Sequence, residues 1–144
     1  MYRGSRCVVA AVLLLLAAGC ALAQNAPATG LQARDFVAVC GDSITEQKLY
    51  SLFIAEYVLM CQPAPNMRAL QAGWGGETAQ GFLARMERDV LALKPTVVTT
   101  CYGMNDGAYR AFDEARGKWY ADNQRAIVQG LKKAGVRLIV LGSP

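Results

Sequence analysis

Short continuous apolar runs alternate along the chain with longer stretches in which apolar residues recur every three or four positions. The short runs are typical of strands that are buried on both faces of a parallel sheet, and the longer stretches are typical of amphipathic helices. Four strands are therefore predicted, at 36–40, 67–72, 96–102 and 136–141.

Three helices are predicted between these strands, because Thr45, Thr78 and Asp113 are of the residue types that cap helix N-termini. They are predicted to end before Pro63, at Lys94-Pro95 and at Gly135. The first helix carries apolar residues at the spacing of a face that packs against a core. These residues are Leu49, Leu52, Phe53, Tyr57 and Met60.

The order β-α-β-α-β-α-β, with the spacing of βαβ units, predicts an α/β fold with a parallel sheet and helices on both of its faces. In such sheets ligands bind beyond the carboxyl ends of the strands. Three loops fall at those ends, 41–45, 73–78 and 103–107, and they contain the unusual chemistry of the sequence.

The N-terminus has the layout of a secretory signal peptide over residues 1–23. Arg3 and Arg6 precede an apolar run, and Ala21-Leu22-Ala23 offers a cleavage site. The apolar run is short for a bilayer span and no second span follows, so no membrane span is expected after the leader is removed. Lipoprotein processing at Cys20 ranks below simple cleavage, and a secreted or periplasmic protein is expected.

Residues 24–34 are predicted to be a flexible lead-in, and 35–144 a single globular domain. Without its leader the chain would carry 13 basic against 11 acidic residues. This balance argues against a nucleic-acid partner. No histidine is present and the cysteine spacing matches no zinc motif, so no metal site is expected. Buried thiols are the default for Cys40 and Cys101, and a disulfide between them stays open.

The first loop, Gly41-Asp42-Ser43-Ile44-Thr45, places a serine where a strand passes into a helix. Its backbone N–H would lie at a helix N-terminus and could stabilise a developing oxyanion. Taken alone, Ser43 could equally be a helix cap. The G-x-S-x-G pattern of the α/β-hydrolase nucleophile elbow is not present, so that fold is disfavoured.

The second loop contains Gly75-Gly76-Glu77-Thr78, and the third contains Gly103-Met104-Asn105-Asp106. Small residues allow a backbone N–H to approach a ligand closely, and the Asn105 side chain can offer an amide N–H. Ordinary turn chemistry would explain either loop alone. A phosphate cradle is disfavoured because neither G-x-G-x-x-G nor the P-loop motif occurs.

Together the three loops resemble the sequence blocks of the SGNH (GDSL-type) hydrolase superfamily of esterases and lipases. The blocks are matched in order by residues 39–45, 72–78 and 103–106, and the match spans roughly 35–144. The resemblance implies a flavodoxin-like, three-layer α/β/α fold with a parallel sheet.

The resemblance also implies the roles of individual residues. Ser43 would attack the acyl carbonyl, and the backbone N–H groups of Ser43 and Gly76 with the Asn105 amide would form an oxyanion hole. Asp42 and Asp106 would brace the loops. No cofactor is implied. The substrate would be an acyl ester of a small molecule or a polysaccharide, and short acyl groups are expected because no long lid insertion separates the blocks.

In this superfamily the catalytic acid and base stand in a fourth block, Asp-x-x-His, and this sequence has no histidine. The chain is therefore expected to be a C-terminally incomplete member, with little turnover and with apolar surface left uncovered at the sheet edge. The rival interpretation is a non-catalytic binding module or degenerate protein. A weaker rival is a nucleotide- or flavin-binding domain of flavodoxin-like fold.

Overall fold

The computed structural model describes residues 30–142. The predicted signal peptide and the first part of the lead-in lie outside the described residues. The strands are β1 (Phe36–Gly41), β2 (Arg68–Gly73), β3 (Val97–Cys101) and β4 (Leu138–Gly142). The α-helices are α2 (Ser43–Glu46), α3 (Tyr50–Glu56), α4 (Ala79–Asp89), α5 (Met104–Gly107) and α6 (Glu114–Lys133). A π-helical turn, Tyr57–Cys61, follows α3, and a 3₁₀ turn, Leu91–Leu93, follows α4.

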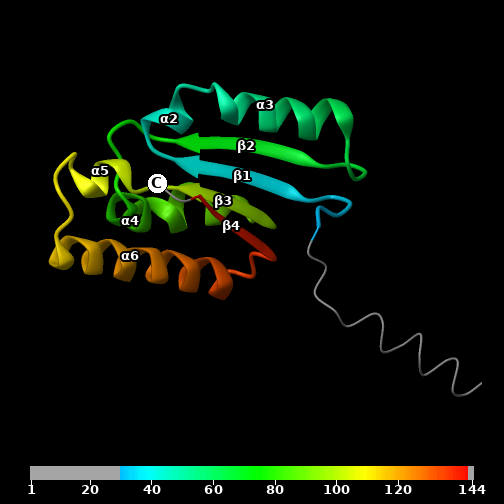
Figure 1. Ribbon diagram of the computed structural model, residues 1–144. Coiled ribbons are helices and arrows are strands. Elements are labelled where there is room, and N and C mark those ends of the chain that lie inside the picture. Colours follow the sequence, from blue (N-terminus) through cyan, green and yellow to red (C-terminus); the bar gives the residue numbers. More distant parts are fainter. Residues whose placement is uncertain (1–29, 143–144) are drawn as a thin grey trace, which may run out of the picture. The chain divides into compact units, whose positions relative to one another are not determined.

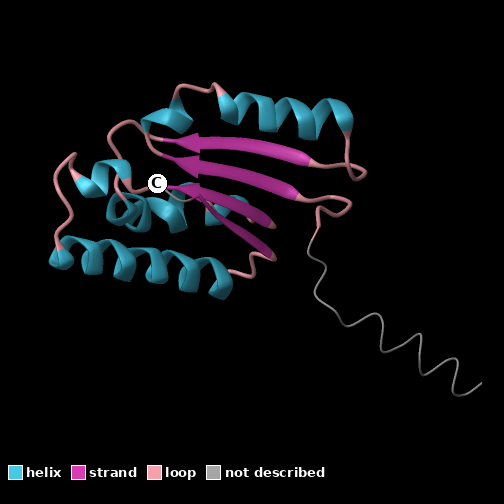
Figure 2. Cartoon of the chain, in the orientation of Figure 1, coloured by secondary structure: helices cyan, strands magenta, loops and turns pink. Residues whose placement is uncertain are grey.

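All four predicted strands are present, and they form one parallel sheet in the order β2-β1-β3-β4. Figure 1 shows α3 on one side of this sheet and α4 and α6 on the other, and Figure 2 shows the same three layers by type of element. The prediction of an α/β/α fold is therefore confirmed.

Side chains alternate across β1 and feed two separate cores. Val37 and Val39 face the layer of α3, whereas Ala38 and Cys40 face the layer of α4 and α6. The core between the sheet and the helices α4 and α6 contains the fully buried side chains of Phe82, Ile127 and Leu131. Tyr102, which directly follows β3, is buried in the same core. Burial raises the pKa of the Cys40 thiol to about 12, so this cysteine stays un-ionised at neutral pH.

The second and third helices begin as the sequence predicts. The Thr78 hydroxyl accepts a hydrogen bond from the Gly81 N–H, and the Asp113 carboxylate accepts from the N–H groups of Ala115 and Arg116. The long helix α6 ends before Gly135, which adopts a φ of 83°. These caps satisfy backbone donors that have no partner inside the helix.

The first helix differs from the prediction in its start, its continuity and its orientation. Asp42 rather than Thr45 caps it, and the helix breaks after Glu46, where Lys48 adopts a positive φ of 61°. The predicted core face points to solvent, because Phe53 is 70% exposed and Met60 is 83% exposed, with Leu49, Leu52 and Tyr57 also exposed. The face that packs on the sheet carries Tyr50, Ser51, Ile54 and Val58.

The three cysteines among the described residues are free. Cys40 lies beside Thr100 in the sheet register, and Cys101 lies beside Gly41. Since successive residues of a strand point to opposite faces, the two thiols lie on opposite faces of the sheet. The disulfide between Cys40 and Cys101 that the sequence left open is therefore not formed.

Strand β4 lies at the edge of the sheet, and its apolar side chains are partly uncovered. Val140 is 46% exposed and Leu141 is 52% exposed. The expectation of uncovered apolar surface at this edge is met. Within residues 30–142 no helix is both long and apolar enough to cross a membrane.

Asp35 joins the amino ends of three strands. Its carboxylate accepts hydrogen bonds from the Gln32 N–H at 2.6 Å and from the Thr96 hydroxyl at 2.7 Å, and it pairs with Arg137. Burial alone would raise the pKa of Asp35, but the hydrogen bonds and the Arg137 guanidinium hold it below the ordinary value of 3.8. The ionised carboxylate therefore stabilises the fold.

Asp35→Asn is expected to lower the free energy of unfolding at pH 7. The stabilisation by Asp35 is fully present above the unfolded pKa and is lost as the pH falls through the lower folded pKa. The difference between the wild type and D35N should therefore shrink below about pH 4. Urea unfolding at pH 7 and at several values below pH 4 measures this difference, and a difference that does not change with pH would contradict the assignment.

Candidate active site

The three predicted loops leave the sheet at the same level. In the sheet register Gly41 lies beside Gly73 on one side and beside Cys101 on the other. The loops that follow β1, β2 and β3 therefore start from adjacent positions at the carboxyl edge. Figure 1 shows α2 and α5 at the arrowhead end of the strands.

Ser43 is the first residue of α2 and is half-buried. The helix start is set by Asp42, whose Oδ1 accepts a hydrogen bond from the Ile44 N–H at 3.0 Å. The N–H of Ser43 donates no hydrogen bond to another described residue, so it remains available at the helix N-terminus. A donor in this position can bind a negatively charged oxygen.

The first turn of α2 packs closely on two glycines, Gly41 at the end of β1 and Gly73 at the end of β2. A Cβ atom on Gly41 would lie 2.0 Å from Oγ1 of Thr45, and one on Gly73 would lie 2.4 Å from the backbone N of Glu46. Thr45 is itself fully buried, and its Oγ1 lies 2.5 Å from the Tyr50 hydroxyl. The first turn of α2 therefore lies directly against the ends of β1 and β2.

Gly76 lies in the loop between β2 and α4 with a φ of 72°, a conformation that favours glycine. Like that of Ser43, its N–H donates to no other described residue. The next residue, Glu77, is held firmly, because its carboxylate receives two hydrogen bonds from Arg85 at 2.5 and 2.6 Å and one from the Tyr102 hydroxyl at 2.9 Å. This network fixes the backbone that carries the Gly76 donor.

Asn105 joins the three loops. Its side-chain amide donates to the backbone carbonyl of Glu77 at 2.9 Å and has a longer contact of 3.4 Å with Oδ2 of Asp42. The first hydrogen bond orients the amide, and the second amide hydrogen is only weakly engaged. The sequence predicted a polar loop here, whereas the structure has the short helix α5.

Asp106 braces the site, as the resemblance implied. Its carboxylate is buried and accepts from the Ala79 N–H at 2.9 and 3.2 Å, so it joins α5 to the start of α4. Burial raises the pKa of Asp106, partly offset by the hydrogen bond from Ala79. Asp42 similarly supports the first loop through the Ile44 N–H.

The sequence did not identify Arg85 as part of this region. Its guanidinium joins Glu77 to the backbone carbonyl of Ala72 at 2.9 Å and lies 5.4 Å from the ring centre of Trp74. Glu77 and Arg85 form a buried ion pair. Because Glu77 precedes the first residue of α4 and Arg85 lies within that helix, the spacing of the two residues did not predict that they pair. Of the two tyrosines that flank the Asn105 loop, Tyr102 is buried in the core and Tyr109 is 79% exposed.

A family model for the GDSL-like lipase/acylhydrolase family matches residues 39–144. These residues include all three loops and most of the fold. This chain belongs to that family. No match was found among curated proteins.

Several solved structures have a similar fold, and two of them are acetyl xylan esterases. The acetyl xylan esterase AlAXEase superposes with a TM-score of 0.64 at 27% identity, covering 76% of this chain and 58% of its own. Axe2, an acetylxylan esterase from Geobacillus stearothermophilus, superposes with a TM-score of 0.62 at 24% identity, covering 78% and 61%. The gut microbial diltiazem-metabolizing enzyme BT4096 gives 0.66 at 25% identity, covering 82% and 29%.

This GDSL-like chain spans less than two thirds of the length of each of these three proteins. Two of the matching Axe2 structures are catalytic mutants, one at an aspartate and one at a histidine three positions further along. The 144 residues of the present chain contain no histidine. Among residues 30–142 no group of three acidic, cysteine or histidine side chains could hold a metal ion.

Proposed function

We propose that this protein is an exported serine ester hydrolase that works through an acyl-enzyme on Ser43. The observation that carries the proposal is the pair of unengaged N–H groups, of Ser43 and Gly76, at one sheet edge with the Asn105 amide. These two N–H groups, with the second Asn105 amide hydrogen, whose contact with Asp42 is 3.4 Å long, can stabilise the oxyanion that forms when a hydroxyl attacks an ester carbonyl.

In the proposed reaction the Ser43 oxygen forms a bond to the acyl carbon while its proton passes to a base. The tetrahedral oxyanion is stabilised by the three donors, and it collapses with loss of the alcohol. Water then releases the acid from Ser43. Because none of the 144 residues is a histidine, we infer that the family's Asp-x-x-His pair must be supplied for efficient turnover, and that these residues alone turn over poorly.

The proposed substrates are short acyl esters, with acetyl esters of carbohydrates as the leading class. This class is supported by the structural similarity to AlAXEase, which is an acetyl xylan esterase. The predicted leader at 1–23 supports export, which suits an extracellular polysaccharide. Faster hydrolysis of long-chain than of acetyl esters by the protein carrying the fourth block would contradict the short-acyl preference.

A serine-reactive phosphonate tests the nucleophile. The expected result is labelling of the tryptic peptide 35–48, in which Ser43 is the only serine, at a rate that increases when imidazole is added as an external base. The same peptide in Ser43→Ala should remain unlabelled. Absence of labelling in a folded wild-type chain, with imidazole present, would favour the rival function, a binding module that has kept the pocket without the chemistry.

Asn105→Ala is expected to lower the Ser43-dependent rate by about 10²–10³, the usual cost of losing one oxyanion donor. The matched control is Asn123→Ala, because the Asn123 amide lies on α6 and donates to the Trp119 carbonyl. The imidazole-dependent labelling rate of the peptide 35–48 measures both variants. Equal rates in N105A and N123A would show that the Asn105 amide contributes nothing to the oxyanion site.

A further inference from the structure

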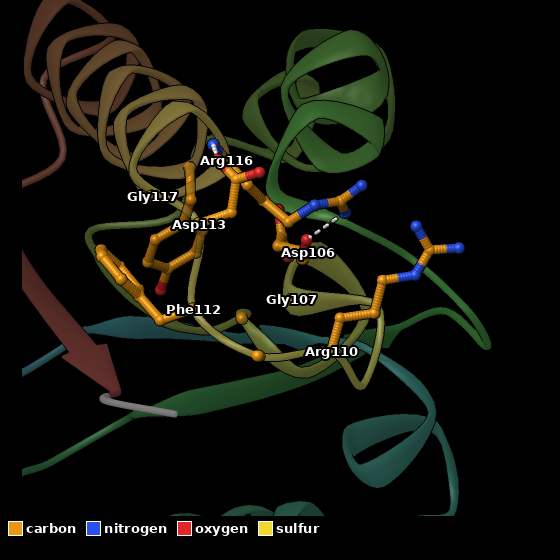
Figure 3. A pocket seen from close by; sticks show the side chains of 10 residues that line it. Asp106, Gly107, Arg110, Phe112, Asp113, Arg116 and Gly117 are labelled. Atoms are coloured by element: carbon orange, nitrogen blue, oxygen red, sulfur yellow. Dashed lines mark hydrogen bonds between the residues drawn. The ribbon is translucent and has the colours of Figure 1, made fainter.

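A cavity of about 290 Å³ lies between α5 and the start of α6, and its lining includes Asp106, the neighbour of Asn105 in the chain. It shares α5 with Asn105, but Asn105 does not line it. Its lining includes two cationic and two aromatic side chains, those of Arg110, Arg116, Phe112 and Tyr120. Figure 3 shows the arrangement of Arg110, Phe112 and Arg116. The mechanism proposed above uses none of these residues.

The two arginines of this cavity differ from most others in the described part of the chain. Arg85, Arg88, Arg125 and Arg137 each pair with a carboxylate. Arg110 and Arg116 form no ion pair with any residue of 30–142. Figure 3 shows the two side chains directed to the same side of the cavity, away from Phe112. Two guanidinium groups placed in this way are suited to a carboxylate ligand.

The orientation of Arg116 is fixed from within the protein. Its Nη1 donates a hydrogen bond of 2.7 Å to the backbone carbonyl of Asp106, the dashed line in Figure 3. This bond uses part of the guanidinium and leaves other N–H groups for a ligand. The cation is therefore positioned beside α5 without being neutralised.

The two carboxylates that line the cavity are already engaged by backbone donors. Asp106 accepts from the Ala79 N–H, and Asp113 accepts from the N–H groups of Ala115 and Arg116 at 2.7 and 3.2 Å. Neither forms an ion pair with the two arginines. Asp106 is buried against α4 and Asp113 caps α6 through Oδ1, so the two guanidinium groups are the cationic groups of the lining that are open to an anionic ligand.

The segment between α5 and α6 presents aromatic rings next to these cations. Tyr109 is 79% exposed and Phe112 is 84% exposed, an unusual state for such large side chains. Ala108 and Tyr109 both adopt positive φ, at 51° and 55°, where residues with a Cβ atom are strained. Consecutive strained residues of this kind are found where a loop conformation serves a function. Exposed rings offer flat apolar surfaces to the C–H faces of sugar rings.

We propose that this cavity is a subsite for a carboxylate-bearing sugar, a uronic acid, on the alcohol side of the ester. Arg110 and Arg116 bind the carboxylate, and Phe112 packs against a sugar ring. That this sugar is part of the substrate rests on the proposed ester hydrolysis. That the cavity binds the sugar does not depend on that proposal. The protein would then select acidic over neutral acylated polysaccharides.

The test compares binding of trigalacturonate and of neutral galactotriose to the whole chain by isothermal titration calorimetry. The expected result is that the acidic trisaccharide binds at least about tenfold more tightly, as a charge-assisted hydrogen bond would give. Arg110→Gln and Arg116→Gln should each remove most of this preference. Arg125→Gln is the matched control, because it removes the same charge from an exposed site on α6 where Arg125 pairs with Asp122.

Arg110→Gln keeps the test decisive if Arg116→Gln fails to fold, because the Arg110 side chain forms no ion pair with any residue of 30–142 and the only hydrogen bond of Arg110 within these residues is a backbone one, to the Gly107 carbonyl, which the substitution leaves in place. Equal affinities for the two trisaccharides, absence of binding to either, or equal losses in R110Q and R125Q would each overturn the proposal. Phosphonate labelling of Ser43 in the same samples separates the two hypotheses. Binding without labelling contradicts the proposed function alone, and labelling without preference for the acid contradicts the subsite alone.

Discussion

Ser43→Ala is expected to remove all of the imidazole-dependent ester hydrolysis by these 144 residues. A serine hydroxyl is a weak nucleophile without a base, and members of a nucleophile–base pair act as a unit. With no histidine in the sequence, loss of the hydroxyl should have little effect in plain buffer. The effect becomes large when imidazole supplies the base. In a protein that carries the family's Asp-x-x-His block, the same substitution should cost about 10⁶ in kcat.

The measurement is the hydrolysis rate of an acetyl ester as a function of imidazole concentration, after subtraction of the protein-free rate. Ser51→Ala is the control, since Ser51 is a buried serine whose hydroxyl donates to the Thr45 carbonyl at 2.9 Å rather than facing the sheet edge. S51A should keep the imidazole-dependent rate at temperatures where it is folded. Identical imidazole dependence in S43A and the wild type would rule out catalysis by Ser43.

Glu77→Ala is expected to destabilise the fold by about 3–5 kcal/mol, because it leaves the Arg85 guanidinium buried without its partner. The side chains of Glu77 and Arg85 are only 6% and 12% exposed, and the hydrogen bonds that Arg85 donates to the Glu77 carboxylate raise the pKa of Arg85. The Tyr102 hydroxyl would lose its acceptor as well. The loop that carries Gly76 should loosen, so the rate of Ser43 labelling should fall with the stability.

Urea unfolding measures the stability, and the matched control is Asp122→Ala. Asp122 pairs with Lys118 and Arg125 on the solvent side of α6, and its side chain is 49% exposed. Exposed pairs of this kind contribute about 1 kcal/mol or less. A loss in E77A no larger than that in D122A would mean that the buried network does not hold the second loop in place.

Much of the fold follows from the sequence because parallel strands and capped helices have strong local signals. The Val- and Thr-rich run 97–101 could be assigned as a strand from its composition, and Thr78 and Asp113 cap the helices that they were predicted to cap. The order of these elements then required a parallel sheet. The sheet edge that carries the loops could also be derived, because it depends only on strand direction.

The orientation of α3 could not be derived in this way. The strongest apolar stripe of this segment, which includes Phe53 and Met60, points to solvent, and the small residue Ser51 is buried. Ser51 can be buried because its hydroxyl finds the Thr45 carbonyl, a contact that no periodicity shows. The break at Lys48 also rotates α3 relative to α2, and only the tertiary structure reveals it.

The placement of the three candidate residues at one sheet edge could be predicted from the sequence, but the contacts that support them could not. Ser43, Gly76 and Asn105 each stand just beyond a strand, so the sequence could place them at one edge. Their support comes from Arg85, whose guanidinium reaches Glu77 and the carbonyl of Ala72 in separate elements. Contacts between elements of this kind follow from packing, which sequence spacing does not encode.

The central claim, that Ser43 is the nucleophile, is tested most directly by trapping the acyl-enzyme. Without a histidine the second, water-dependent step should also be slow, so the acyl group should remain on Ser43. Incubation of the whole chain with an activated acetyl ester, with imidazole present as the external base, followed by acid quenching and mass spectrometry of the tryptic peptide 35–48, should show one acetyl group on Ser43 that hydroxylamine removes. Acetylation confined to lysines, or an unmodified Ser43 in a folded chain, would contradict the account.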